Sequence, residues 1–362
     1  MSEENKTMQQ DITRRGFLGG AAAIGLALPS AFSRTATAQT AIVPKDETTS
    51  PTSNRAEADR IDIHHHFVPP AYKTEVDPKS PLQKPVRLWT PEKTLADMQE
   101  AGTATAVLSI APPGLWFGEA VASRKLSRTC NEYAARMVAD HPGRFKMFVA
   151  LPLPDIDGAL REIEYGLDTL KASGVGFFTS YDGKYLGHPS YAPLLEELNR
   201  RKAILYTHPV TCPSCVGLVP EINDRVIEFG TDTTRTIASL LFSGAAARYP
   251  GIHFIFSHAG GTMPFLIERF QDAAKAPEMA QRLPKGLMYE LQRFYYDTAQ
   301  SANPAAMSAL SKVVPISQVL FGSDFPYKGS SVQVAGLHKC GFSPQELKAI
   351  ERENALRLLK ET

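Results

Sequence analysis

From residue 61 onward, short β-rich runs alternate with helical patterns, and this alternation constrains the fold more than any other feature. Strands that alternate with helices pair in parallel through right-handed crossovers. The pattern predicts eight strands, at 61–66, 106–110, 145–150, 175–179, 203–208, 252–258, 294–297 and 318–324. It predicts helices between and after them, at 91–101, 119–140, 157–172, 190–201, 233–248, 264–275, 304–312 and 344–355.

Eight such units in about 300 residues favour an α/β fold of the closed (β/α)8 type, a TIM barrel, over an open doubly wound sheet. The sequence has no G-x-G-x-x-G after its first predicted strand, which argues against a dinucleotide-binding sheet. Two connections, 66–91 and 209–230, are unusually long. Because they follow strands one and five, we expect them to be loop insertions at the catalytic mouth, where they can act as lids.

The first 58 residues differ in kind from the rest. Paired arginines, Arg14 and Arg15, precede an apolar run at 17–28 that is too short to span a bilayer, and Ala36-Thr37-Ala38 offers a signal-peptidase site. We interpret 1–38 as a twin-arginine signal peptide, 39–58 as a disordered linker and 59–362 as the folded barrel. The protein is therefore expected in the periplasm or outside the cell. The alternative is an N-terminal anchor helix.

Charge and cysteine content exclude several classes of partner and scaffold. Lys plus Arg (39) nearly cancels Asp plus Glu (38), so electrostatics gives no reason to expect nucleic acid or a membrane surface as partner. Four cysteines are too few for a disulfide scaffold. Cys212 and Cys215 have C-x-x-C spacing, and three interpretations stay open: ordinary loop residues, a disulfide formed after export, or a metal or redox role.

Metal-binding side chains gather at the predicted strand ends. His64 and His66 end the first strand two residues apart, so they point to one side and His65 points to the other. His208, His258 and Asp324 end the fifth, sixth and eighth strands, and all five side chains should converge on the carboxyl face of a barrel. Three imidazoles and a carboxylate around an open position suit zinc, with manganese and iron as alternatives.

Each of these residues also has an ordinary structural interpretation. A single histidine at a strand end is commonly a hydrogen-bonded polar residue, and Asp324 could form a turn or cap a helix. His141, His253 and His338 are interpreted as structural. Because four histidines and an aspartate coincide at ends of the same polarity, the metal site is favoured over a metal-free barrel.

The motifs at these positions resemble those of the amidohydrolase superfamily. They resemble most its decarboxylase branch, typified by aminocarboxymuconate-semialdehyde decarboxylase and the resorcylate and methylsalicylate decarboxylases. The resemblance covers 61–359, including 89–98, Tyr296-Asp297-Thr298-Ala299 and Asn354-Ala355. The motifs that carry it are IDIHHHFVP at 61–69, THP at 207–209, SHAGG at 257–261 and FGSDFP at 321–326.

The resemblance implies one divalent metal, a small carboxylate substrate and a possible homodimer. The residues that match the family's metal ligands are His64, His66, His208 and Asp324. His258 matches its catalytic acid/base, which stands beside the metal without binding it. Related enzymes with two metals use a lysine after the fourth strand, and 176–180 contains none.

The implied reaction is a metal-dependent, non-oxidative decarboxylation, a C–C lyase reaction, of a small aromatic or unsaturated acid. The metal orients the substrate and offsets developing charge, and an acid protonates the ring carbon so that the carboxylate can leave. Either His258 or Asp324 could supply the proton. Asp297 ends the seventh strand and could orient His258 or a metal ligand, or it could cap the next helix.

Candidate substrate residues come from the same predicted strand ends. The cations Lys84 and Arg87 lie in the first long connection. Where the semialdehyde decarboxylase has an arginine, this chain has Leu82, which favours a salicylate-like ring acid. The aromatic candidates are Phe67, Tyr72, Trp89, Trp116, Phe178, Tyr181 and Phe325.

Three other functions remain open on the same sequence. A metal-dependent hydrolase of a lactone or amide would use His258 or Asp324 to activate water on the same barrel. A hydratase of an unsaturated acid is a second option. A periplasmic binding protein that has lost catalysis is the non-enzymatic one.

Overall fold

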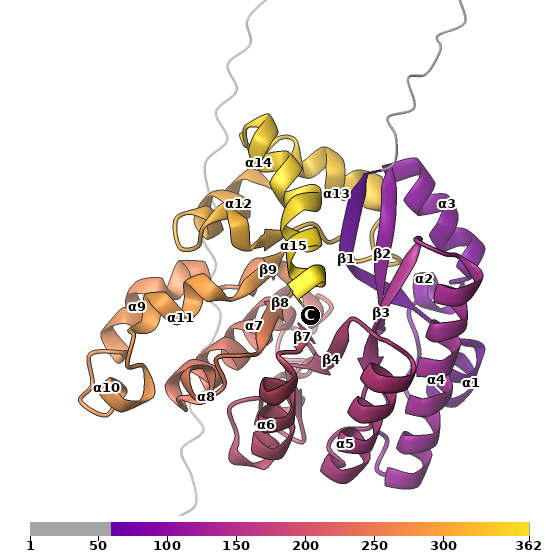
Figure 1. Ribbon diagram of the computed structural model, residues 1–362, viewed down its shortest axis with the longest axis horizontal. Coiled ribbons are helices and arrows are strands. Elements are labelled where there is room, and N and C mark those ends of the chain that lie inside the picture. Colours follow the sequence, from indigo (N-terminus) through magenta and orange to yellow (C-terminus); the bar gives the residue numbers. More distant parts are fainter. Residues whose placement is uncertain (1–58, 362) are drawn as a thin grey trace, which may run out of the picture. The chain divides into compact units, whose positions relative to one another are not determined.

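The computed structural model describes residues 59–361. The predicted signal peptide (1–38) and linker (39–58) lie outside them. Eight parallel strands form one sheet in the order β1-β2-β3-β4-β7-β8-β9-β10, and helices surround it (Figure 1). These strands are β1 Arg60–Phe67, β2 Thr103–Ile110, β3 Phe145–Ala150, β4 Gly174–Phe178, β7 Ile204–His208, β8 His253–Phe256, β9 Tyr295–Asp297 and β10 Val319–Leu320.

The sheet closes because the segment after β10 bonds back to β1. The amide of Ile63 donates to the carbonyl of Phe321 at 2.9 Å, and the amide of His66 donates to Phe325 at 2.8 Å. The amide of Asp324 donates to the carbonyl of His64 at 2.9 Å. The chain is therefore a (β/α)8 barrel, as predicted, although the regular part of the eighth strand is shorter than expected.

The helices follow the predicted alternation. The main layer consists of α3 Pro91–Ala101, α4 Ala120–Asp140, α5 Ile156–Glu164, α6 Ala192–Arg201, α7 Arg225–Phe242, α9 Ile267–Ala273, α12 Pro304–Ser311 and α13 Ser330–Leu337. Shorter or terminal helices are α1 Pro70–Val76, α2 Lys84–Arg87, α8 Ala245–Arg248, α10 Met279–Arg282, α11 Leu287–Arg293, α14 Pro344–Lys348 and α15 Asn354–Glu361. The strands β5 Ser180–Tyr181 and β6 Lys184–Tyr185 form a small antiparallel hairpin after β4.

The helix α3 shows how local sequence fixes an element. Thr90 caps its amino end by accepting from the amide of Lys93, and Pro91 occupies its first position. Gly102 ends it in a left-handed conformation, with φ of 66°. These three signals are all local, and the observed bounds equal the predicted ones.

Both long connections contain helices that periodicity did not predict. The first includes α1 and α2, and the second ends in α7, which begins at Arg225 and not at 233 as expected. The buried face of α7 near its start is polar and includes Glu228, Asp232 and Thr233. Because the prediction relied on a repeat of apolar residues, a polar buried face concealed the first two turns.

The barrel interior is filled by side chains and closed at one end, so a functional site can lie only at the other end. Apolar residues from seven of the eight strands fill the ring, among them Ile63, Phe148 and Ile255. Ala355 and Leu358 of α15 pack against this cluster and close the amino-terminal end. Figure 1 shows α15, in yellow, crossing the middle of the ring. The carboxyl ends of the strands therefore open on the opposite face, where barrel enzymes hold their active sites.

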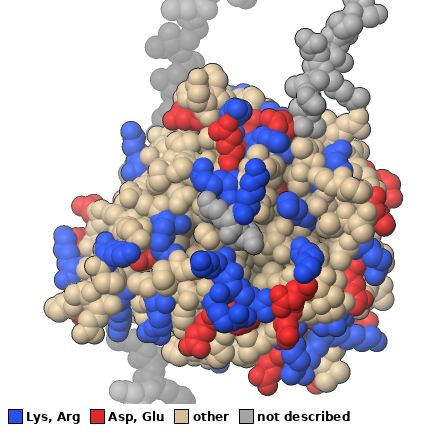
Figure 2. Space-filling view, viewed as in Figure 1, with Lys and Arg blue, Asp and Glu red and all other residues tan. Residues whose placement is uncertain are grey.

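Surface charge and hydropathy are unremarkable on the described part. On the face seen in Figure 2, Lys and Arg side chains are spread over the surface, and Asp and Glu form smaller groups, mostly toward its edges. Within residues 59–361, the helices are too short or too polar to traverse a bilayer.

Candidate metal centre at the barrel mouth

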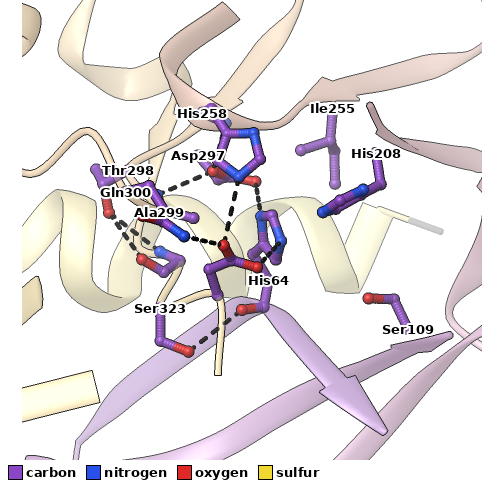
Figure 3. Close-up of polar contacts among 12 residues, drawn as sticks. His64, Ser109, His208, Ile255, His258, Asp297, Thr298, Ala299, Gln300 and Ser323 are labelled. Carbon is purple, nitrogen blue, oxygen red and sulfur yellow. Dashed lines mark hydrogen bonds and ion pairs between the residues drawn. The ribbon is translucent and has the colours of Figure 1, made fainter. Parts of the chain in front are cut away.

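Four histidines and one aspartate converge at the carboxyl ends of the strands. The Nε2 atoms of His64 and His66 lie 3.2 Å apart, and Asp324 Oδ1 is 3.0 Å from the first and 3.1 Å from the second. Ligand atoms of His64, His208, His258 and Asp324 all lie within 4.8 Å of one another. Figure 3 shows the rings of His64, His208 and His258 directed toward a common centre. The structure thus brings together the five residues predicted from strand ends.

A bulge in β1 aims the histidine pair. Between Asp62 and His65 this strand has one residue more than β2, so Ile63 and His64 both face the barrel interior. His65 points outward to α3, where its ring stacks on Phe325 at 4.8 Å and its Nδ1 lies 2.9 Å from Asp62 Oδ2. The predicted alternation at 64–66 is confirmed. The bulge is what turns His64 and His66 toward the interior although Ile63 also faces it.

Hydrogen bonds on the far side of each ring fix which nitrogen faces the centre. His64 Nδ1 lies 2.9 Å from Asp297 Oδ2, and His208 Nδ1 lies 2.8 Å from the carbonyl of Pro209. Because a carboxylate and a carbonyl only accept, both Nδ1 atoms carry the proton. His66 Nδ1 is 3.3 Å from Ser109 Oγ. The Nε2 lone pairs are left for a ligand in the centre, which is the usual arrangement behind a bound metal.

Asp297 links the histidine cluster to the backbone of the segments that follow β8 and β9. Its second oxygen accepts from the amides of His258 at 2.9 Å and Ala299 at 3.0 Å. Of the alternatives that the sequence left open, the structure shows Asp297 orienting His64 and holding the backbone of His258. The helix α12 is capped by Asn303 instead.

The donor set fits a divalent cation. Ligands about 2.0–2.1 Å from a tetrahedral ion lie about 3.3 Å from one another, close to the separations of His64, His66 and Asp324. Two Nε2 atoms that face each other with a carboxylate between them need a shared proton or a cation.

His258 Nδ1 is buried and has no hydrogen-bond partner among the described residues.

The electrostatics of the cluster favour positive charge at its centre. Burial lowers the pKa of His64, but Asp297 and Asp324 outweigh it and raise that pKa to about 10. Burial and the neighbouring histidines hold the pKa of His208 well below its usual value. Burial would raise the pKa of Asp324, but His64 and the other histidines bring it well below the normal range. Asp324 is therefore ionised and attracts a cation.

Backbone strain is concentrated at the same place. His258, Gln300 and Asp324 have φ of 55°, 54° and 66°, in the left-handed region that non-glycine residues rarely adopt. Strain of this kind costs about 1–3 kcal/mol per residue and persists where function requires the geometry. Gln300, which sequence reasoning did not identify, donates from Nε2 to Asp324 Oδ2 at 2.7 Å.

Two cavities lie near the cluster, and one of them is lined by its residues. An inner chamber of about 620 Å³ is lined by His208, His258 and Asp324 together with Gln300, Ser301, Asn223, Val226, Gly230, Gly261 and Thr262. An outer chamber of about 420 Å³ includes Trp116 and Tyr181 in its wall. Four residues line both: Gln83, Arg225, Phe229 and Tyr327.

Several predicted substrate residues lie elsewhere. Trp89 is buried in the core, where its indole donates to Thr94 at 2.8 Å, because a buried indole N–H needs an acceptor. Arg87 is exposed and pairs with Asp77 at 3.6 Å. Phe325 stacks on His65. None of these three residues lines either chamber.

The other aromatic candidates divide between core and chamber. Phe67 and Tyr72 are fully buried, whereas Trp116 and Tyr181 line the outer chamber. Phe178 lies beneath His208, with ring centroids 6.1 Å apart. Lys84 lines neither chamber. The cation at the site is Arg225, which falls inside the stretch predicted as loop.

Comparison with known proteins identifies the family of the chain and relatives that are named as decarboxylases. The sequence profile of the family described as "Amidohydrolase" matches residues 61–360. The decarboxylase macB of Penicillium terrestre is 38% identical over 284 residues, 74% of this chain and 84% of that protein. The 6-methylsalicylic acid decarboxylase of Penicillium expansum is 37% identical over 277 residues, 74% and 85%.

A solved structure confirms the fold. Dihydroxybenzoic acid decarboxylase from Polaromonas sp. JS666, determined with bound manganese and the inhibitor 2-nitroresorcinol, superposes with a TM-score of 0.74. It is 22% identical, and the alignment covers 83% of this chain and 97% of that one. At this identity the likeness concerns the fold alone.

Proposed function

The chain belongs to the amidohydrolase family, and on this premise we propose that it is a metal-dependent, non-oxidative decarboxylase of a small aromatic carboxylic acid. The observation that carries the proposal is the cluster of imidazoles with Asp324 at the wall of a chamber of about 620 Å³. The relatives named as decarboxylases support the reaction type.

The metal would be held by His64, His66, His208 and Asp324. The Nε2 atoms of His64 and His66 lie 3.0 and 3.1 Å from Asp324 Oδ1, and a ligand atom of His208 lies within 4.8 Å of those of His64 and Asp324. A divalent cation there would orient the substrate carboxylate and offset the negative charge that develops as carbon dioxide leaves. We propose zinc, because nitrogen and carboxylate donors suit it, with manganese or iron as alternatives. Manganese is bound in the Polaromonas enzyme. Reconstitution of metal-free protein with each ion tests this choice.

His258 is the proposed acid that protonates the ring carbon. Both oxygens of Asp324 are engaged, one by His64 and His66 and the other by Gln300, whereas His258 Nδ1 has no partner among the described residues. His258 lines the inner chamber, and its backbone amide is held by Asp297. A histidine changes protonation near neutral pH, which suits this step.

The experiment that tests the function compares two reactions of the metal-loaded protein. Carbon dioxide release is measured from a panel of hydroxybenzoates, and hydrolysis is measured on lactones and amides. We expect decarboxylation of at least one ring acid, abolished by a chelator and restored by metal. Hydrolysis without release of carbon dioxide would establish the alternative hydrolase instead.

We also propose export to the periplasm or the medium. The support is the sequence at Arg14 and Arg15, the apolar run after it and the small residues at 36–38, all outside the described residues. Replacement of both arginines by lysine should leave the protein in the cytoplasm of a host that exports the parent chain. Unchanged export would exclude a twin-arginine signal.

A homodimer is the oligomer that we propose. The exposed apolar side chains of Val216, Leu218 and Val226, close to the chambers, support self-association. Light scattering of the purified protein coupled to size exclusion gives the mass directly, and a monomer at micromolar concentration would exclude the dimer.

A further inference from the structure

The two chambers share part of their wall, and this shared wall is formed from segments far apart in the sequence. Gln83 comes from the connection after β1, Arg225 and Phe229 from the start of α7, and Tyr327 from the segment after β10. These four residues line both cavities. A ligand seated at the histidine cluster therefore shares the inner chamber with these four side chains.

Arg225 is the cation of the shared wall. Within residues 59–361 it is the only Lys or Arg on either chamber wall, and it forms no ion pair there. Its guanidinium lies over the ring of Phe229, 6.0 Å from the centroid. Burial and Asp324 raise the pKa of Tyr327, and the charge of Arg225 opposes them. Arg225 therefore lies on the wall that the two chambers share, and none of the described carboxylates forms an ion pair with it.

The size of the cavities points to a ligand larger than one bare ring. Pockets of about 300–1,000 Å³ hold drug-sized ligands. The inner chamber, at about 620 Å³, falls in this range, and the outer chamber adds about 420 Å³. Asp182 is the other fully charged side chain of the outer wall, and it does not line the inner chamber.

We propose that Arg225 is a specificity-determining residue that binds a second acidic group, carried across the ring from the carboxylate that departs. The substrate class is then an aromatic acid with two anionic groups. A guanidinium binds a carboxylate through two parallel hydrogen bonds, while Phe229 and Tyr327 flank the ring. This inference rests on the proposed decarboxylase function, because it seats the departing carboxylate at the histidine cluster.

The test compares two ligands of equal shape. 2-Hydroxyterephthalate carries a carboxylate across the ring, and 4-carbamoyl-2-hydroxybenzoate carries a neutral amide in its place. Dissociation constants are measured from the fluorescence of Trp116, which lines the outer chamber. We expect the parent protein to bind the dicarboxylate about 10–100-fold more tightly than the amide.

Variants separate charge recognition from folding. Arg225→Met should bind the two ligands about equally. Arg225→Lys should recover part of the preference, because lysine keeps the positive charge but lacks the planar guanidinium that donates two parallel hydrogen bonds. Arg248→Met, an exposed arginine of α8 that lines neither chamber, should behave as the parent. An intact preference in Arg225→Met, or no preference in the parent, would overturn the inference.

Carbon dioxide release from the same ligands is recorded in parallel. Release from 2-hydroxyterephthalate with an Arg225-dependent preference supports both proposals. An Arg225-dependent preference without release from any ring acid supports the role of Arg225 and overturns the decarboxylase function. Release without the preference keeps the function and removes Arg225 from substrate recognition.

Discussion

His64 and His258 lie in different surroundings within the cluster. The first has one nitrogen fixed by Asp297 and the other directed at His66 and Asp324. The second lies farther out, with Nε2 3.7 Å from Asp324 Oδ2, and its ring is parallel to Phe229 on the chamber wall. Two neighbouring imidazoles thus have different environments, which predicts different effects of their replacement.

The first prediction follows from that contrast. His64→Ala should lose the metal, because it removes a central ligand. His258→Asn should keep the metal and lose turnover by about 100–10,000-fold, the usual contribution of a general acid. Elemental analysis of both purified variants, beside turnover, measures each effect. Equal loss of metal in the two would show that His258 is a ligand.

Proton release on metal binding gives a second prediction. In the metal-free site the pKa of His64 is about 10, so His64 is protonated at neutral pH and donates to both Asp297 and Asp324. Binding through Nε2 must displace that proton. Because protons compete below pH 10, the apparent metal affinity should rise about tenfold per pH unit between pH 7 and 9. Calorimetry in buffers of different ionisation enthalpy should count one proton per ion, and an affinity independent of pH would contradict this.

Gln300 gives a third prediction. Its amide holds Oδ2 of Asp324, which leaves Oδ1 facing His64 and His66. Gln300→Met should weaken metal affinity by about tenfold, as loss of an outer partner does. Gln99→Met, an exposed glutamine of α3, is the control and should leave the affinity unchanged. Titration of each metal-free variant with metal in the presence of a competing chelator measures the affinity. Equal affinities of the two variants would contradict the role of Gln300.

At this scale the sequence predicted the charged centre but not the surrounding residues. His64, His66, His208, His258 and Asp324 follow from one rule, that parallel strands end on one face. Gln300 and Arg225 follow from no such rule, since their roles depend on a strained turn and on a helix in an expected loop. Trp89 was placed at the substrate because position along the chain cannot distinguish a chamber wall from the core.

Among the elements, β1 and the segment after β10 depend most on each other. The carboxylate of Asp62 accepts from the amide of His64 at 3.1 Å and from the amide and hydroxyl of Ser323 at 3.0 and 2.6 Å. It also lies 2.9 Å from His65 Nδ1. One buried side chain therefore fastens the bulge of β1 to the turn that carries Asp324, where the barrel closes.

Asp62→Ala tests this closure. The change leaves several buried donors without an acceptor, and each such loss costs about 1–3 kcal/mol. We expect a lower free energy of unfolding in urea by at least that amount, together with weaker metal binding. Asp272→Ala, whose partner is the exposed Lys275, should change stability by less than about 0.5 kcal/mol. Equal stability of the two variants would mean that Asp62 does not hold the closure.

The elements were predicted well where their signals are local. The helix α3 has a cap, a proline and a terminal glycine within its own sequence, and its bounds were correct. The start of α7 was missed because Glu228, Asp232 and Thr233 are buried through contacts that only the fold provides. The bulge in β1 depends on pairing with β2, so no pattern within β1 predicts it.

At the scale of the whole molecule, the two ends of the barrel have different roles: one is closed by packing, and the other holds the candidate site. The helix α15 closes the amino-terminal end with Ala355 and Leu358, and the carboxyl end holds the charged cluster and both chambers. The barrel class was predicted from the count and alternation of elements. Its closure, through bonds from the segment after β10 to β1, became visible only in three dimensions.

The most direct test is a crystal structure with anomalous scattering recorded at the edges of zinc, manganese and iron. The account predicts a single peak about 2.0–2.2 Å from Nε2 of His64, His66 and His208 and from an oxygen of Asp324, with His258 beyond bonding distance. A peak bonded to His258 in place of His66 would contradict the assignment of roles. No peak in metal-supplemented protein, or one away from the ends of β1, β7 and β10, would contradict the metal centre itself.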